Sequence, residues 1–115
     1  MDHRGCLFKF APFTLDADAR VLLRDGWPLR LQPKQVDVLL ALIEKQGEVV
    51  STRDLMTTVW GQTAVEPGNL TRHISELRRA LGDEDEEYIR TVHRRGYKFV
   101  AQVTIVNPSK AAAGV

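Results

Sequence analysis

The sequence predicts a single α+β domain in which short strands come first, three helices follow and a pair of strands closes the fold. Three observations support this prediction: strand-like runs broken by turn residues in the first third, apolar residues at helical spacing in the middle, and two β-prone runs around a basic segment near the end. A length of 115 residues, with 43% hydrophobic and 27% charged residues, is typical of one compact globular domain.

The first third of the chain contains three short β-prone runs. They cover residues 7–10, 13–15 and 19–23, and a turn separates each from the next. Asp25-Gly26 follows the third run and is a dipeptide preferred in two-residue hairpin turns, where both positions need a positive φ. We therefore expect the chain to reverse at Asp25-Gly26 into a fourth strand.

That fourth strand is predicted over residues 27–31. Its alternation of apolar and non-apolar residues places Trp27, Leu29 and Leu31 on one face, which we expect to be buried. Pro28 has no N–H to give to a neighbouring strand, so the strand should lie at an edge of its sheet.

Two helices are predicted next. The first begins at Pro33 and ends before Gly47. Its apolar stripe consists of Val36, Leu39, Leu40 and Ile43, and Val38 and Leu42 add a second buried flank. Ser51 followed by Asp54 resembles a capping box, so a second helix should start there and end at Gly61. Its inner face should contain Leu55, Met56, Val59 and Trp60.

A third helix is predicted over residues 69–81, after a loop at 62–68. Leu70, Ile74, Leu77 and Leu81 are spaced 4, 3 and 4 residues apart, which places them on one face, and Gly82 ends the helix. At about 100° per residue, the opposite face contains polar side chains, namely Arg72, Ser75, Glu76 and Arg79. An exposed polar helix face of this kind fits a DNA major groove, although many solvent-facing helices look similar.

The end of the domain is predicted to be a hairpin with a basic tip. Strands at 88–92 and 97–103 flank His93-Arg94-Arg95-Gly96, where arginines on a projecting tip can enter a narrow minor groove. The acidic run 83–87 is interpreted as a solvated connector, with the alternative that the tip arginines pair with it. The predicted domain spans 7–103, between an N-terminal tail at 1–6 and a linker or disordered tail at 104–115.

The predicted order of elements is that of a winged helix-turn-helix, and several motifs resemble one family with this fold, the OmpR/PhoB-type winged helix DNA-binding domain of bacterial transcriptional regulators. The resemblance covers about residues 7–103. It depends on Leu31-Gln32-Pro33-Lys34, Val49-Val50-Ser51, Val59-Trp60-Gly61, His73-Ile74, Leu77-Arg78-Arg79-Ala80-Leu81, Ile89-Arg90-Thr91-Val92 and Gly96-Tyr97-Lys98-Phe99. The family fold implies an N-terminal four-stranded antiparallel sheet, three helices and a C-terminal hairpin wing.

The resemblance also implies roles for individual residues. The positions that face bases in the family are Thr71, Arg72, Ser75 and Glu76. The positions expected at phosphates are Trp60, Asn69, His73, Arg78 and Arg79, and the wing residues expected in the minor groove are His93, Arg94 and Arg95. For Trp60 the alternative is a ring that closes the core, and for His73 it is a surface histidine without a function.

The resemblance implies double-stranded DNA as the partner, often bound by two protomers head-to-tail, and RNA polymerase as a partner of loop 62–68 in some members. A domain of this type that begins at Met1 is similar to the N-terminal arrangement of CadC/ToxR-like regulators, whose sensor follows a linker. The leading hypothesis is sequence-specific DNA binding for transcriptional regulation. The alternative hypothesis is a winged helix that contacts RNA polymerase or another regulator.

Other function classes find little support in the sequence. Cys6 is the single cysteine, which excludes an internal disulfide, and the Cys and His residues lack zinc-site spacing, so we expect no metal and no cofactor. The three histidines lie in separate segments without a nucleophile or paired carboxylates, so we expect no enzyme. No apolar run has the roughly 20 residues that span a bilayer. We expect a cytoplasmic, nucleoid-associated domain, with any membrane anchor in a downstream segment.

Overall fold

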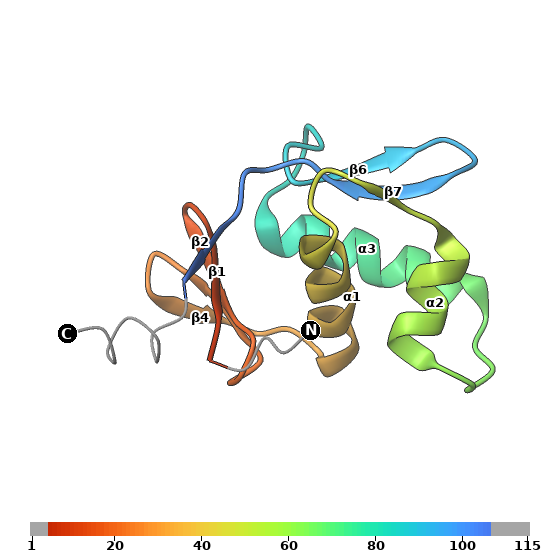
Figure 1. Cartoon of the computed structure of the whole chain (residues 1–115), viewed down its shortest axis with the longest axis horizontal. Helices are drawn as coiled ribbons and strands as arrows, with labels where there is room; N and C mark the ends of the chain where they lie inside the picture. Colours follow the sequence, from red (N-terminus) through yellow and green to blue (C-terminus); the bar gives the residue numbers. More distant parts are fainter. Residues whose placement is uncertain (1–4, 107–115) are drawn as a thin grey trace. The chain divides into compact units, whose positions relative to one another are not determined.

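The structure, a computed structural model, describes residues 5–106. These residues form two compact units, shown in Figure 1. The sheet unit consists of the described residues up to Leu31 and from Gln102 onward, and the helical unit is Gln32–Ala101. The predicted tail residues 1–4 and 107–115 lie outside the described part of the chain.

The sheet unit is a five-stranded antiparallel sheet. Its strands are β1 (Leu7–Phe10), β2 (Phe13–Asp16), β3 (Val21–Arg24), β4 (Trp27–Leu29) and β8 (Thr104–Val106), and their order across the sheet is β4-β3-β2-β1-β8. The register aligns Phe8 with Leu15 and Leu15 with Leu22, and all three side chains are buried on the same face. The three predicted strands are thus confirmed as β1, β2 and β3, the third beginning at Val21 instead of 19, and their side chains alternate between a buried face and the opposite face.

The predicted hairpin turn at Asp25-Gly26 is confirmed, because the two residues have φ angles of 49° and 85°. β4 follows the turn and lies at the sheet edge, as Pro28 predicts. The expected burial of β4 is wrong, since Trp27 is 76% exposed and Leu29 and Leu31 are only half-buried. The physical reason is the place of Trp27 at the start of the edge strand, beside the turn. Its one cross-strand partner, Arg24, extends over the Phe13 ring instead, with the guanidinium 5.5 Å from the ring centroid.

The fifth strand, β8, corrects the expected sheet of four strands. β8 pairs antiparallel with β1, with Leu7 opposite Val106 and Lys9 opposite Thr104. Residues 104–106, which we expected to begin the linker, therefore belong to the sheet unit. β1 has a strand on each side, and Cys6, which was placed in the N-terminal tail, is buried.

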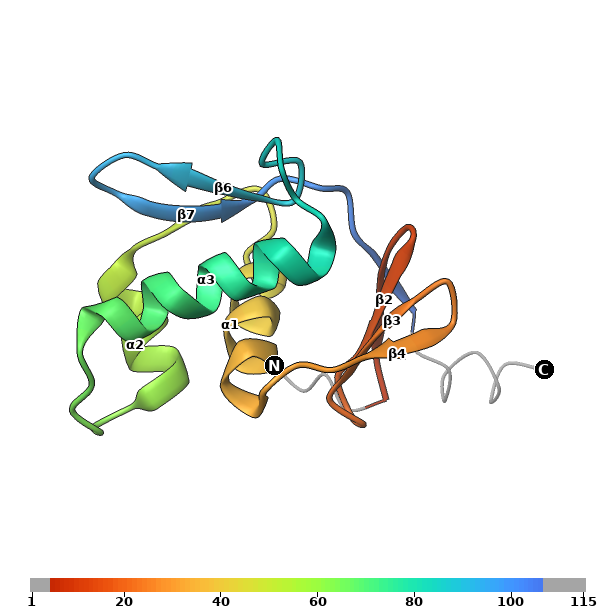
Figure 2. The same ribbon diagram turned by 180° about the vertical axis from the view of Figure 1, so that it is seen from behind.

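The helical unit contains three helices and a small sheet, as Figure 2 shows from behind. The helices are α1 (Pro33–Glu44), α2 (Thr52–Trp60) and α3 (Pro67–Leu81), and the strands are β5 (Val49–Val50), β6 (Ile89–Val92) and β7 (Gly96–Phe99). β7 lies between β5 and β6, so the closing hairpin is anchored to the segment that enters α2. The two-residue strand β5 was not predicted, and the second strand of the hairpin ends at Phe99 instead of 103.

The helix starts and ends follow local side-chain chemistry. The Ser51 hydroxyl accepts a hydrogen bond from the Asp54 backbone N–H at 3.0 Å, which caps α2 as predicted, and Gly61 ends that helix. Gly82 ends α3 in the left-handed conformation, with a φ of 65°. α3 begins at Pro67, two residues before the predicted start, so the preceding loop is shorter than 62–68.

The core of the helical unit consists of the predicted apolar faces. The buried residues include Val36, Val38, Leu39, Leu42 and Ile43 from α1, Leu55 and Val59 from α2, and Leu70, Ile74, Leu77 and Leu81 from α3. Leu40, Met56 and Trp60 are half-buried. A hydrogen bond also links α1 to α2, since the ammonium group of Lys34 donates to the Val59 carbonyl at 2.9 Å. This packing leaves the opposite face of α3 in solvent.

Candidate nucleic-acid interface

The exposed face of α3 contains most of the side chains predicted to face bases. Thr71, Arg72 and Ser75 are exposed, and so is Arg79, which was predicted to contact phosphate. Arg72 donates a long hydrogen bond of 3.4 Å to the side-chain oxygen of Asn69, one turn earlier. Since the apolar residues of α3 are buried on the other side, the wheel prediction of one buried and one polar face is confirmed for these residues.

Glu76 differs from the other predicted base-facing residues. Its side chain is 36% exposed, and its Oε2 accepts a hydrogen bond from the Nε2 of Gln35 on α1. The carboxylate therefore has a protein partner before any ligand arrives. Sequence reasoning missed Gln35, although the signal was present, since Gln35 is the third residue of α1 and Gln at this position commonly caps a helix start.

His73 was expected at the surface in both interpretations, and the structure corrects this. The residue is 4% exposed, and its ring stacks on the half-buried Trp60 ring with centroids 5.7 Å apart. Its Nδ1 is buried without a hydrogen-bond partner in the described chain, at 4.0 Å from Glu76 Oε2. The reason is that Trp60 of α2 covers the flank of α3 where the wheel places His73, and we omit His73 from the proposed phosphate contacts.

The environment of His73 disfavours its charged form. Burial lowers the pKa of His73 below its ordinary 6.5, the nearby Arg72 charge lowers it further, and the Glu76 carboxylate opposes both effects. The imidazole is therefore neutral near pH 7.

This lowered pKa predicts a loss of stability in mild acid. The unfolded chain takes up a proton near pH 6.5 and the folded chain does so only at a lower pH, so stability is full above about pH 7.5 and falls as the pH drops below 6.5. The slope from this one group is at most about 1.4 kcal/mol per pH unit. Urea unfolding between pH 7.5 and 5.5 should show the slope, and His73→Phe should flatten it. The exposed His93→Gln variant should keep the slope of the parent, and equal slopes for the parent and His73→Phe would contradict the assignment.

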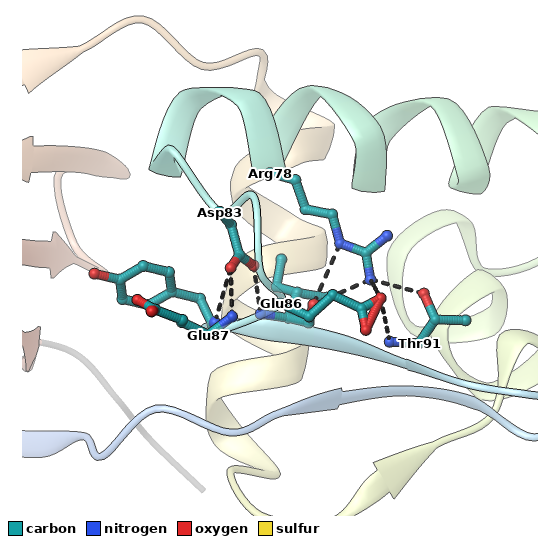
Figure 3. A network of polar contacts seen from close by, with 7 residues as sticks. Arg78, Asp83, Glu86, Glu87 and Thr91 are labelled. Atoms are coloured by element: carbon teal, nitrogen blue, oxygen red, sulfur yellow. Dashed lines mark hydrogen bonds and ion pairs between the residues drawn. The ribbon is translucent and has the colours of Figure 1, made fainter.

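The guanidinium of Arg78, another predicted phosphate contact, forms hydrogen bonds and an ion pair with other residues of the protein (Figure 3). Its guanidinium donates to the Ile89 carbonyl at 3.0 Å and to the Thr91 hydroxyl at 2.7 Å, and it pairs with the Glu86 carboxylate at 3.3 Å. Arg78 thereby ties α3 to β6 and to the acidic connector, which was expected to be solvated. These bonds give Arg78 a structural role, so we also omit it from the proposed phosphate contacts.

The wing formed by β6 and β7 has an exposed basic tip. His93, Arg94 and Arg95 are exposed, and the Arg95 backbone N–H closes the turn by donating to the Val92 carbonyl at 2.9 Å. Within residues 5–106, Arg94 and Arg95 form no ion pair, so the alternative in which they pair with the acidic connector is not seen. Figures 1 and 2 both place the tip at the end of the helical unit where α2 and the start of α3 lie.

A groove of about 440 Å³ lies between the wing and the start of α2. It is lined by three arginines and four hydroxyl-bearing residues, together with Val92 and Gly96; the polar residues are Arg53, Arg94, Arg95, Ser51, Thr52, Thr91 and Tyr97. These donors extend the basic surface of the wing toward α2. In the part of the chain that the structure describes, no group of His, Cys, Asp or Glu residues is arranged to hold a metal ion.

None of the helices within residues 5–106 combines the length and the apolar character needed to cross a bilayer. This finding concerns the described residues alone.

Comparisons with known proteins agree with this architecture. The family described as "Transcriptional regulatory protein, C terminal" matches residues 26–99. The chain is 40% identical over 102 residues to the transcriptional regulator HilA of Salmonella typhimurium, a match that covers 88% of this chain and 18% of HilA. The chain thus spans less than a fifth of that curated relative.

The solved structures that are similar to the chain include two DNA-binding domains. One is the DNA-binding domain of Escherichia coli CadC, with a TM-score of 0.75 and 34% identity, covering 85% of this chain and 94% of that one. The other is the Klebsiella pneumoniae RstA DNA-binding domain in complex with the RstA box, with a TM-score of 0.72 and 26% identity, covering 82% and 96%. From its motifs, its fold and these matches, the chain belongs to the transcriptional regulatory protein C-terminal family, the OmpR/PhoB type of winged helix domain.

Proposed function

We propose that this domain binds double-stranded DNA in a sequence-dependent way and thereby regulates transcription, with α3 in the major groove and the wing tip in the adjacent minor groove. The observation that carries the proposal is the polar face of α3, where Arg72 and Ser75 are exposed while Ile74 and Leu77 are buried in the core. Family membership and the likeness to a DNA-bound RstA domain support it.

The proposed contacts fall into two classes. Thr71, Arg72, Ser75 and Glu76 read bases, because arginine can donate two hydrogen bonds to guanine and a carboxylate accepts from cytosine. Trp60, Asn69 and Arg79 hold phosphates, and His93, Arg94 and Arg95 lie in the minor groove, where a narrow groove concentrates negative potential. Base contacts supply sequence preference, whereas phosphate contacts supply register and salt dependence.

The test is selection of bound sequences from a random duplex pool, followed by binding of single variants to the selected site. Arg72→Ala should relax the preference at one base pair, with a loss of about 1–3 kcal/mol of discrimination. Arg94→Ala should weaken binding to all duplexes similarly and reduce the slope of log affinity against log salt by about one. Arg30→Ala removes an equal charge from an exposed position in the sheet unit and serves as the control.

Two results would contradict the proposal. If Arg72→Ala and Arg94→Ala bind the selected duplex as tightly as the parent at moderate salt, the assigned roles are wrong. If the parent selects no sequence and binds duplexes weakly and without preference, the alternative of a protein-contact module gains support. The spacing of selected half-sites also tests the expected head-to-tail pair of protomers. The proposal also includes a contact of loop 62–68, whose last two residues lie in the first turn of α3, with RNA polymerase, and a cytoplasmic location.

A further inference from the structure

A small polar cluster lies behind the exposed face of α3. It consists of Gln35 from the first turn of α1 and of His73 and Glu76 from α3. Gln35 and His73 are 5% and 4% exposed, whereas Glu76 reaches solvent. Buried polar side chains need partners, so the hydrogen bonds of this cluster constrain where the Glu76 carboxylate can be.

Gln35 uses both ends of its side-chain amide. Its Oε1 accepts a hydrogen bond from the Gln32 backbone N–H at 3.0 Å, which caps the start of α1, and its Nε2 donates to Glu76 Oε2. Rotating the amide by half a turn would place a donor against the Gln32 N–H and an acceptor against the carboxylate. Both contacts would then be lost, so the orientation of the amide is determined by the two partners together.

His73 forms no hydrogen bond to Glu76. Its Nδ1 is 4.0 Å from Glu76 Oε2, beyond hydrogen-bond distance, and it has no other partner in the described chain. Arg72, one turn before Glu76 on α3, bonds to Asn69 instead. Within the described residues, the Glu76 carboxylate is therefore oriented by Gln35 of α1, which lies 41 residues earlier in the chain.

We infer that Gln35 is a positioning residue that sets the base preference at the position that Glu76 reads. The inference rests on the proposed function and adds a residue that does not touch DNA. A free glutamate can rotate away from an unsuitable base, whereas a carboxylate held from behind presents a fixed acceptor to the groove. A fixed acceptor favours the amino group of cytosine and is repelled by a base that offers only acceptors at that place.

The experiment exchanges donor and acceptor between the two residues in the full 115-residue chain. Gln35→Glu keeps an acceptor for the Gln32 N–H but places a second carboxylate against Glu76. The double variant Gln35→Glu with Glu76→Gln restores the hydrogen bond with the donor and acceptor reversed. Gln102→Glu adds the same charge at an exposed position of the sheet unit and is the matched control. Relative affinities are measured for duplexes that carry each of the four bases at every selected position.

We expect Gln35→Glu to lower discrimination roughly tenfold at the one position that Glu76→Gln also alters, and to leave the other positions within about twofold. The double variant should recover discrimination there with adenine preferred, because glutamine pairs with adenine in the major groove. Gln102→Glu should behave as the parent. If Gln35→Glu does not fold, Gln35→Met should show the same loss at the same position.

Three results would overturn the inference. The first is a folded Gln35→Glu, or Gln35→Met, with the base preference of the parent at the Glu76 position. The second is a double variant whose loss equals the product of the two single losses, which would mean that the residues act independently. The third is a Glu76→Gln variant with unchanged preference at every position. A parent that selects no sequence at all would instead refute the proposed function itself, so the two failures are distinguishable.

Discussion

Replacing Gly96 with alanine should destabilise the helical unit by about 3 kcal/mol, since steric overlap and backbone strain add. A Cβ atom at this position would lie 2.0 Å from the Val50 carbonyl oxygen and 2.8 Å from the Ser51 Cα. Both atoms belong to the backbone of the segment that β7 pairs with, so neither can move aside as a flexible side chain would. Gly96 also has a φ of 144°, which L side chains rarely adopt.

Urea unfolding of the parent and of Gly96→Ala measures this effect. Gly68→Ala is the matched control, because Gly68 lies in the first turn of α3 with no atom within 4 Å of the added Cβ and without a positive φ. The control should leave stability unchanged or raise it by up to about 1 kcal/mol. A Gly96→Ala variant within about 0.5 kcal/mol of the parent would show that β5 and β7 are not packed as closely as described.

The role of Gly96 illustrates what the sequence predicts and what it does not. A glycine after three polar residues indicates a turn, and a hairpin is indeed present at this place. The turn itself, however, is made by residues 93–95, with Arg94 in the left-handed conformation at a φ of 63°. The glycine is required one residue later, by the approach of β5, and β5 comes from a segment more than 40 residues earlier. Local patterns carry no information about such an approach.

The same distinction separates the confirmed parts of the fold from the corrected ones. The buried face of α3 and the turn at Asp25-Gly26 depend on neighbours within a few residues, and both are confirmed. β8 depends on pairing between Leu7 and Val106, at opposite ends of the chain, and no local pattern indicates it. The expected burial of Trp27 failed for a related reason, because alternation identifies which residues share a face of a strand but not whether other side chains cover that face.

In the candidate site, too, the sequence predicts what depends on neighbouring residues of one helix and not what depends on other elements. A helical wheel separates the exposed Arg72 and Ser75 from the buried Ile74 and Leu77. The wheel cannot show that α2 covers His73, that α1 supplies a partner for Glu76, or that β6 occupies the guanidinium of Arg78. Each of these contacts comes from another element of the helical unit. Polar residues at the flanks of the helix therefore need the tertiary structure before they are assigned to a ligand.

Replacing Asp83 in the acidic connector should also reduce stability strongly. The sequence predicted that Asp83 is solvated, and the structure shows that it is buried. Asp83 is 5% exposed, and its carboxylate accepts three backbone hydrogen bonds, which Figure 3 shows. Oδ1 accepts from the N–H of Glu87 at 2.6 Å and of Tyr88 at 3.1 Å, and Oδ2 accepts from the N–H of Ile89 at 2.8 Å. Charge counting along the sequence could not reveal this, since it treats all five acidic residues alike.

Asp83→Ala should therefore destabilise the helical unit by about 4 kcal/mol, because three N–H groups lose a charged acceptor and the Ile89 N–H is left buried. Asp85→Ala removes the same charge from an exposed neighbour and should change stability by less than about 0.5 kcal/mol, which urea unfolding can resolve. Asp83→Asn should fall between the two, since an amide keeps one acceptor and turns a donor toward the remaining N–H groups. Equal stabilities for the Asp83→Ala and Asp85→Ala variants would mean that Asp83 is solvated after all.

The hydrogen bonds of Asp83 also hold the start of the wing, because Ile89 is the first residue of β6. Weakening these bonds should make the position of the wing less fixed. Asp83→Asn should therefore weaken DNA binding even where the domain remains folded.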